Sequence, residues 1–305
     1  MSRPPAALRG ALWMVGAMLS FALMAVSVRE LLQTMGRFEI LFVRSFVSLV
    51  LLLLFLPRRG LAALRTRRLG LHVLRNAFHF AGQYAWVYAI SLLPLATVFA
   101  IEFTMPVWAA LLAMMFLGER FNRGRVVMLV LGIAGVVVML RPGLAVIQPA
   151  ALVMLAGAFA YASTMVATKR LSAEDSAFAI LFYMGVIQLP LGLIPALPQW
   201  VWPGMRDLPW VIVIGAAGLV AHYCMARAFR IADAMVVVPI DFLRLPLIAV
   251  VGMLFYSEPL ELAIMIGAAV IFAGTFYSLR RESMGRLAPS SSSRSAAAAA
   301  SSGRR

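Results

Sequence analysis

The stretch Asp241 to Glu258, DFLRLPLIAVVGMLFYSE, decides the fold, because it is long and apolar yet holds an acid, an arginine and a proline. Its length and composition predict a membrane-spanning helix. Charges inside such a helix are costly, so they point to function. The same pattern occurs 139 positions earlier, in Glu102 to Glu119, EFTMPVWAALLAMMFLGE. The chain is therefore expected to hold two copies of one membrane unit.

The agreement between the copies extends beyond these two stretches. At the same offset, Tyr84–Arg141 aligns without a gap on Tyr223–Arg280, and 13 of the 58 pairs are identical. Apolar chains often match by chance, so the identities alone are weak evidence. The rare acids of both stretches fall at one offset, and this coincidence carries the argument for a duplication.

The composition places the chain among integral membrane proteins. It has 305 residues, of which 63% are hydrophobic and 13% charged, whereas a soluble domain is about 45–50% apolar and about 25% charged. The net charge of +15 does not indicate nucleic acid, because the arginines lie in short loops and tails, as the positive-inside rule predicts. A single cysteine, Cys224, excludes an intramolecular disulfide.

Hydropathy predicts an all-α integral membrane protein with ten transmembrane helices. The segments are about 10–29, 38–56, 70–91, 95–117, 125–141, 149–168, 177–197, 209–230, 235–256 and 260–280. Five helices per copy is an odd number, so the copies should form two inverted five-helix repeats, an architecture of secondary transporters. The expected parts are a cytoplasmic N-terminus 1–9, repeats 10–141 and 149–281, and a disordered cytoplasmic tail 288–305.

The loop charges predict that both termini are cytoplasmic. With that orientation, the inner side holds Arg3, Arg9, Arg58, Arg59, Arg65, Arg67, Arg68, Arg120, Arg123, Arg125, Lys169, Arg170, Arg280, Arg281 and Arg286. The outer side holds only Arg29, Arg37, Arg141 and Arg206.

Ten helices, the duplication and an acid that ends an apolar helix in each copy form a known pattern. That acid lies in LGER at 117–120 and in YSEP at 256–259, and Gly132–Gly143 reads GIAGVVVMLRPG. Over about residues 10–282, the chain resembles the drug/metabolite transporter superfamily, in its EamA-type ten-helix form. The resemblance implies an inner-membrane carrier of small organic molecules that works by alternating access. DFLRLP is similar to a subgroup of uptake carriers for metabolites such as S-adenosylmethionine, but neither substrate nor direction is implied.

Glu102 and Asp241 are the repeat-equivalent acids of the fourth and ninth helices. Each lies seven to eight residues into its helix, about 10–12 Å along the axis. We expect them to bind substrate or a proton, or else to form a structural ion pair. Prolines near them predict helix breaks at Pro106, Pro239 and Pro246, because proline frees the carbonyl four residues back.

Arg244 follows Asp241 by three residues, so the two share a helix face and should pair. Arg244 could also offer its planar fork to a carboxylate or phosphate of a substrate. Arg44 and Arg75 lie only about one and a half turns from their helix ends, and we expect them to extend to the membrane interface.

Gln83 and His222 are repeat-equivalent, and each precedes one of the paired Tyr84 and Tyr223. The resemblance implies that their helices, the third and eighth, line the cavity together with the fourth and ninth. The amide and imidazole could orient a substrate, and the tyrosines could stack on a flat ring. The alternative for Gln83 and His222 is an interhelical hydrogen bond.

Glu102 is the candidate proton-coupling carboxylate. Asp241 has Arg244 one turn away, which should keep it ionised, whereas Glu102 has no cation within its own helix. This holds unless Arg44 or Arg75 reaches Glu102 from another helix. Other helix-end acids, Glu119 and Glu258, suit gating or capping. His72 and His79 share a helix face but have no visible third ligand, so we expect no metal.

These features predict a secondary carrier of a small polar or aromatic metabolite. No GxSx motif, GxGD aspartate pair or HExxH motif is present, so we expect no enzyme and no cofactor. The alternative is a non-transporting membrane scaffold or receptor, which would have no need of buried charges. The expected partners are the substrate and the lipid bilayer, with no nucleic acid, and a homodimer is left open. The expected location is the inner membrane.

Overall fold

The computed structural model describes residues 6–54, 64–117, 122–141 and 148–287. Within these ranges the regular structure is helical and contains no strand. The predicted disordered tail 288–305 and the acid Glu119 lie outside the described residues. The predicted N-terminal segment 1–9 ends inside the first helix, which begins at Ala6.

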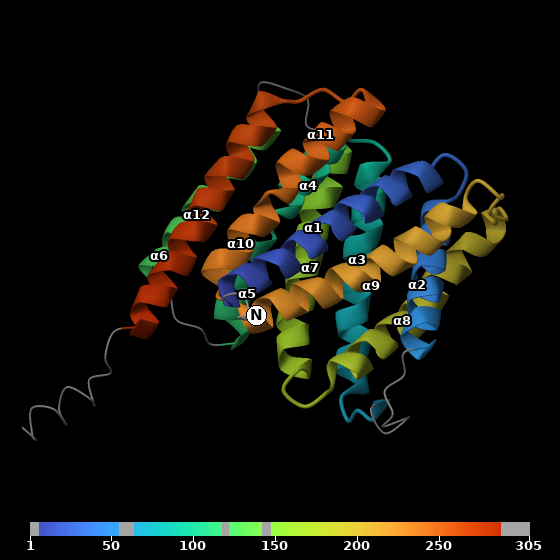
Figure 1. The fold of residues 1–305 in the computed structure, drawn as a ribbon, viewed down its shortest axis with the longest axis horizontal. Coiled ribbons are helices and arrows are strands. Elements are labelled where there is room, and N and C mark those ends of the chain that lie inside the picture. The colour runs from blue at the N-terminus through green and yellow to red at the C-terminus, as the bar shows by residue number, and fades with distance from the viewer. Residues whose placement is uncertain (1–5, 55–63, 118–121, 142–147, 288–305) are drawn as a thin grey trace, which may run out of the picture.

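The helices follow one another along the chain with short connections (Figure 1). They are α1 (Ala6–Leu31), α2 (Arg37–Leu54), α3 (Leu69–Ile90), α4 (Leu95–Glu102), α5 (Met105–Leu117), α6 (Arg123–Leu140), α7 (Pro149–Leu171), α8 (Ala177–Ala196), α9 (Leu208–Ile231), α10 (Ala234–Phe242), α11 (Arg244–Tyr256) and α12 (Leu262–Leu287), with a short 3₁₀ turn at Leu197–Gln199.

The predicted all-α membrane fold is confirmed. Eight helical segments of the described chain are long and apolar enough to cross a membrane, with α4 and α5 counted as one segment and α10 and α11 as another. The remaining helices, α2 and α3, are richer in charged and polar residues, and with them the structure is compatible with the ten predicted spans.

The duplication is visible in the helix boundaries. Four helices of the first half and their counterparts in the second half begin at the same separation of 139 residues. The paired starts are Leu69 and Leu208 for α3 and α9, Leu95 and Ala234 for α4 and α10, Met105 and Arg244 for α5 and α11, and Arg123 and Leu262 for α6 and α12. The offset found in the sequence is therefore also the offset of the fold.

Equivalent helices of the two halves pack against each other and run antiparallel. On α2 and α8, Phe42 lies beside Gly192 and Leu49 beside Gly185. Because the residue numbers increase in opposite directions, α2 and α8 are antiparallel, as two inverted repeats require. The same relation holds for α6 and α12, which lie side by side at one edge of the molecule (Figure 1).

Small residues allow α6 and α12 to approach closely. A Cβ atom on Gly135 would lie 2.7 Å from the carbonyl oxygen of Gly267, and a Cβ on Gly267 would lie 2.6 Å from the carbonyl oxygen of Gly135. Close backbone contact of this kind is a usual means of helix association in membranes, where the hydrophobic effect between helices is absent.

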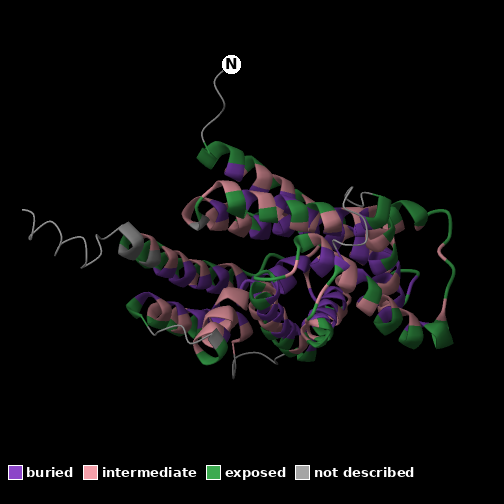
Figure 2. Ribbon diagram, turned by 90° about the horizontal axis from the view of Figure 1, so that it is seen from below, coloured by how far each residue is buried: buried purple, intermediate pink, exposed green. Residues whose placement is uncertain are grey.

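The other two major contacts join different positions of the two halves: α1 packs on α9, and α3 packs on α7. The buried residues lie on the helix faces that meet, and exposed apolar residues cover the outward faces, as expected for a protein surrounded by lipid (Figure 2). Helix α4 of the first half also packs against α11 of the second half.

Candidate functional site

Two interrupted helices meet at the centre of the fold. The first helix stops at Glu102 and resumes at Met105, one residue before Pro106. The second stops at Phe242 and resumes at Arg244, two residues before Pro246. Since proline cannot donate to the carbonyl four residues back, each interruption lies where the prolines weaken the helix. Pro239 lies inside α10.

The breaks place the charged residues at the helix ends that face each other. Arg244, at the start of α11, donates from Nη2 to Glu102 Oε1 at 3.2 Å. Its Nε lies 3.8 Å from Asp241 Oδ1. Trp86 on α3 donates its indole N–H to the second oxygen of Glu102 at 2.9 Å. The three charged side chains therefore form one cluster, with two carboxylates and one arginine.

Aromatic rings surround this cluster. The guanidinium carbon of Arg244 lies 4.7 Å from the ring centre of Phe21 and 5.1 Å from those of Phe99 and Phe103. Phe103 stacks on Phe242 across the two breaks, with ring centres 4.2 Å apart. Cation–π contacts of this kind lower the cost of keeping an arginine in a dry interior.

Arg244 is the cation that pairs with Glu102. This pair was not predicted from the sequence. Glu102 has no cation within its own helix, but Arg244 reaches it from the other half of the chain. The premise that separated Glu102 from Asp241 is therefore wrong, because both carboxylates share Arg244. The cluster also matches the alternative of an interhelical ion pair.

A second polar cluster lies on α3 and α8. The side-chain amides of Gln83 and Gln188 both come within 2.8 Å of His79 Nδ1. Gln188 is fully buried, and its oxygen accepts a hydrogen bond of 3.1 Å from Arg44. Sequence reasoning missed Gln188, although an isolated glutamine in the apolar run of α8 is a signal that could have identified it.

The expectation that Arg44 and Arg75 extend to the membrane interface is wrong. Their exposed fractions are 7% and 6%. Arg75 donates from Nε to Thr168 Oγ1 at 3.1 Å and from Nη1 to Asn76 Oδ1 at 2.8 Å. Thr168 lies on α7 and Asn76 is the next residue of α3, so polar contacts inside the protein replace the expected contacts with water.

His222 lies between the two clusters. Its Nδ1 is 2.7 Å from the carbonyl oxygen of Gly218, one turn back on α9. Its ring packs edge-on against Phe21, with centres 5.6 Å apart, and against His79 at 6.4 Å. Since Phe21 also contacts Arg244, aromatic rings connect the Glu102 cluster to the Gln188 cluster.

The predicted tyrosines lie elsewhere. Tyr84 is half-buried and stacks on Phe38 of α2, with ring centres 4.6 Å apart. Tyr223 is 55% exposed and packs edge-on against Trp13 of α1. No contact joins either tyrosine to Glu102, Asp241 or Arg244 among the described residues, whereas Gln83 lies in the second cluster and His222 between the two clusters.

Polar contacts close the end of the bundle at Glu258, here called the Glu258 end. Arg29, at the end of α1, forms an ion pair with Glu258 just after α11. Glu258 also accepts a hydrogen bond of 2.7 Å from the backbone N–H of Leu95, at the start of α4. Tyr256 donates to Glu30 at 2.7 Å. These contacts tie α1, α4 and α11 together.

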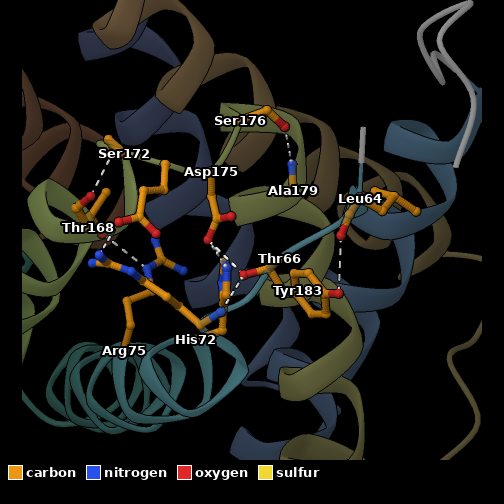
Figure 3. Close-up of polar contacts among 12 residues, drawn as sticks. Leu64, Thr66, His72, Arg75, Thr168, Ser172, Asp175, Ser176, Ala179 and Tyr183 are labelled. Atoms are coloured by element: carbon orange, nitrogen blue, oxygen red, sulfur yellow. Dashed lines mark hydrogen bonds and ion pairs between the residues drawn. The ribbon is translucent and has the colours of Figure 1, made fainter. Parts of the chain in front are cut away.

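Figure 3 shows the opposite end of the bundle, here called the Asp175 end. Asp175, in the connection between α7 and α8, lies 2.9 Å from His72 Nε2 and accepts a hydrogen bond of 2.9 Å from Thr66 (Figure 3). The Tyr183 hydroxyl donates to the carbonyl of Leu64 at 3.2 Å. The start of α3 is thereby fixed to α7 and α8.

A small pocket opens beside the second cluster. Its lining includes Arg44, Ser45 and Ser48 of α2, Gln188 of α8 and His222 of α9. The pocket volume is about 20 Å³, which is close to the room that one water molecule needs. The interior beside the second cluster is therefore nearly filled.

Comparisons with known proteins agree with this fold. The EamA-like transporter family matches the chain twice, over residues 8–141 and 148–280. The S-adenosylmethionine uptake transporter of Rickettsia prowazekii (strain Madrid E) is 28% identical over 275 residues, which cover 90% of this chain and 94% of the relative. The riboflavin transporter of Brucella anthropi is 32% identical over 250 residues, covering 80% and 88%.

A solved crystal structure with 19% sequence identity superposes with a TM-score of 0.63 and covers 94% of this chain and all of that one. At this identity, the likeness shows the fold alone. The chain is a multi-pass membrane protein and belongs to the EamA-like transporter family, within the drug/metabolite transporter superfamily. Its relatives are named as transporters of small metabolites rather than as enzymes.

Proposed function

We propose that this protein is a secondary active transporter that moves a small polar or aromatic metabolite across the inner membrane by alternating access. The observation that carries the proposal is the ion pair between Arg244 and Glu102. It joins two broken helices, one from each repeat, in the interior of the fold. Broken helices at the interface of inverted repeats are where carriers of several folds bind their substrates.

The charges of this cluster favour substrate binding over a purely structural role. Two carboxylates share one arginine, and Asp241 Oδ1 has no hydrogen-bond partner among the described residues. The Asp241 side chain is 24% exposed, more than that of Arg244 at 6%. A cationic or hydrogen-bond-donating group of a substrate could therefore bind Asp241, while Phe103 and Phe242 pack against a flat ring.

The two closed ends of the bundle suggest how access alternates. The Glu258 end is tied by Arg29, and the Asp175 end is tied by His72. Alternating access requires each set of contacts to break while the other holds. The arginine distribution supports a cytoplasmic Asp175 end, with both termini on that side. A homodimer is not needed for this mechanism.

The most informative experiment is transport by the purified protein in proteoliposomes. S-adenosylmethionine and riboflavin, the substrates named for relatives, are the first compounds to test. A carrier should give protein-dependent uptake of a labelled metabolite. Unlabelled metabolite inside the vesicles should accelerate this uptake. The alternative, a non-transporting scaffold or receptor, would give binding in a thermal-shift assay without uptake.

A further inference from the structure

Arg44 is a buried cation in a polar pocket. It lies on α2 and is 7% exposed. Its Nη2 donates to Gln188 Oε1, while its Nε has no hydrogen-bond partner within the described part of the chain. The pocket beside it is lined by Gln188 and His222 from two other helices. An unused guanidinium N–H in such a place is able to bind a further acceptor.

The charge around Arg44 is not balanced. Its hydrogen bond goes to a neutral amide, and the partners of Arg75 are neutral as well. Asn76 Oδ1 accepts from Arg75 and, at 3.4 Å, from Gln188, so both arginines belong to one hydrogen-bonded network. Among the described residues, no carboxylate pairs with either arginine. Buried cations are normally paired, so this network lacks an anion.

The two serines of the pocket are already committed as hydrogen-bond donors. Ser45 donates to the carbonyl of Leu41 at 2.8 Å, and Ser48 donates to that of Gly215 at 3.0 Å. His222 Nδ1 donates to the carbonyl of Gly218, which leaves its Nε2 as an acceptor, so Arg44 is the donor of the pocket with hydrogen-bonding capacity left. Its planar fork matches the two oxygens of a carboxylate.

We propose that Arg44 forms an anion subsite that binds a carboxylate of the transported metabolite. The proposal rests on the transport function proposed above and names the substrate class as amphoteric. Glu102 and Asp241 together carry one more charge than Arg244 can neutralise, so that end of the interior favours a cationic group. The Arg44 end favours the carboxylate, and Phe21 and His222 lie between the two ends.

Benzoate and benzamide test this subsite, and neither compound needs to be the transported metabolite. Either molecule binds only when alternating access widens the pocket beyond its volume of about 20 Å³ in this structure. The two molecules have the same ring and nearly the same size, but benzoate alone is an anion. The unfolding midpoint of the purified protein is measured by tryptophan fluorescence at constant ionic strength. A ligand that binds the folded state raises this midpoint, so benzoate should raise it and benzamide should not.

Variants locate the effect. Arg44→Gln should abolish the shift with benzoate. Arg44→Lys keeps the charge but loses the planar fork, so its affinity for benzoate should fall at least about threefold. If Arg44→Gln does not fold, the affinity of Arg44→Lys for benzoate tests the subsite. Arg37→Gln is the matched control, because Arg37 lies on the same helix but contacts Ser91 and Tyr88 at the Glu258 end; its shift should equal that of the wild type.

Equal shifts with benzoate and benzamide in the wild type, or an undiminished benzoate shift in both Arg44 variants, would overturn the subsite. This result is distinguishable from failure of the transport function. Arg44-dependent binding of benzoate in a protein that transports nothing would leave the anion subsite standing in a receptor. Transport without Arg44-dependent binding would remove the subsite and leave the carrier.

Discussion

Arg244 Nη2 and Glu102 Oε1 lie 3.2 Å apart although they are separated by 142 positions in the chain. Each belongs to the broken helix of a different repeat. Both side chains are largely buried, with exposed fractions of 6% and 15%. Removing one partner of such a pair leaves an uncompensated charge, which costs about 3–5 kcal/mol. This ion pair therefore couples the two halves in the interior, and a substitution in it should affect both.

The first prediction concerns the fork of Arg244. Arg244→Lys keeps the positive charge but cannot hold two carboxylates and three aromatic rings in the same geometry. Transport should fall about tenfold or more while the amount of protein in the membrane stays near wild type. Arg281→Lys, an exposed arginine on α12, is the control. Wild-type transport by Arg244→Lys would reduce Arg244 to a simple counter-ion.

The second prediction concerns proton coupling. Arg244 lies beside both carboxylates, so a nearby cation does not separate Glu102 from Asp241, and we propose that substitution tests Glu102, the candidate from the sequence. Gln in its place can still accept the indole N–H of Trp86 but cannot take up or release a proton. Glu102→Gln should exchange labelled for unlabelled metabolite, yet it should lose accumulation driven by a pH gradient. The measurement compares both activities in the same proteoliposomes, with Glu261→Gln as control. Accumulation by Glu102→Gln under an imposed pH difference would make Glu102 a structural ion-pair partner only.

The third prediction compares two ion pairs near the same end of the bundle. The pair of Arg29 and Glu258 is 22% and 12% exposed, whereas that of Arg141 and Glu261 is 42% and 43% exposed. Glu258→Gln should lower the free energy of unfolding by about 1–3 kcal/mol. Glu261→Gln should change it by about 0–1 kcal/mol, because solvent screens the exposed pair.

Denaturant titrations of both variants in the same detergent give these values. Equal losses for the two substitutions would show that Glu258 does not fasten α1 to α11 as the geometry indicates.

The fourth prediction is the orientation in the membrane. From the arginine asymmetry we expect both termini in the cytoplasm. In a protein with Cys224→Ala, single cysteines near Arg37 and Asp207 should react with an impermeant reagent outside intact cells, and a cysteine at Gly60 should not. External labelling at Gly60 would reverse the assignment of the two ends.

Much of the fold could be predicted from the sequence, because its main features are local or periodic. The offset of 139 residues gives the duplication, and an odd number of helices per copy gives the inversion that the antiparallel α2 and α8 display. Pro106 and Pro246 mark the helix interruptions, since the loss of a backbone hydrogen bond is a local effect.

The composition of the site could be predicted less well, because it depends on contacts between helices. Arg44 and Arg75 lie near helix ends in the sequence, but Gln188 and Thr168 on other helices hold them inside. Spacing within a single helix pairs Arg244 with Asp241 alone. Tyr223 packs against Trp13 because α9 lies beside α1. The residue spacing within α9 does not predict which helix Tyr223 contacts.

The most direct test of the central claim is transport by Asp241→Asn. Asp241 is the carboxylate of the cluster with an oxygen that accepts no hydrogen bond among the described residues, so its neutralisation should remove the proposed substrate contact. Asp233→Asn is the matched control, because Asp233 is exposed on the same helix and caps its N-terminus, a role that Asn fills equally well. With equal amounts in the membrane, Asp241→Asn should lose both exchange and accumulation, and Asp233→Asn should keep them. Wild-type exchange by Asp241→Asn would contradict a substrate site at the crossing of the two broken helices.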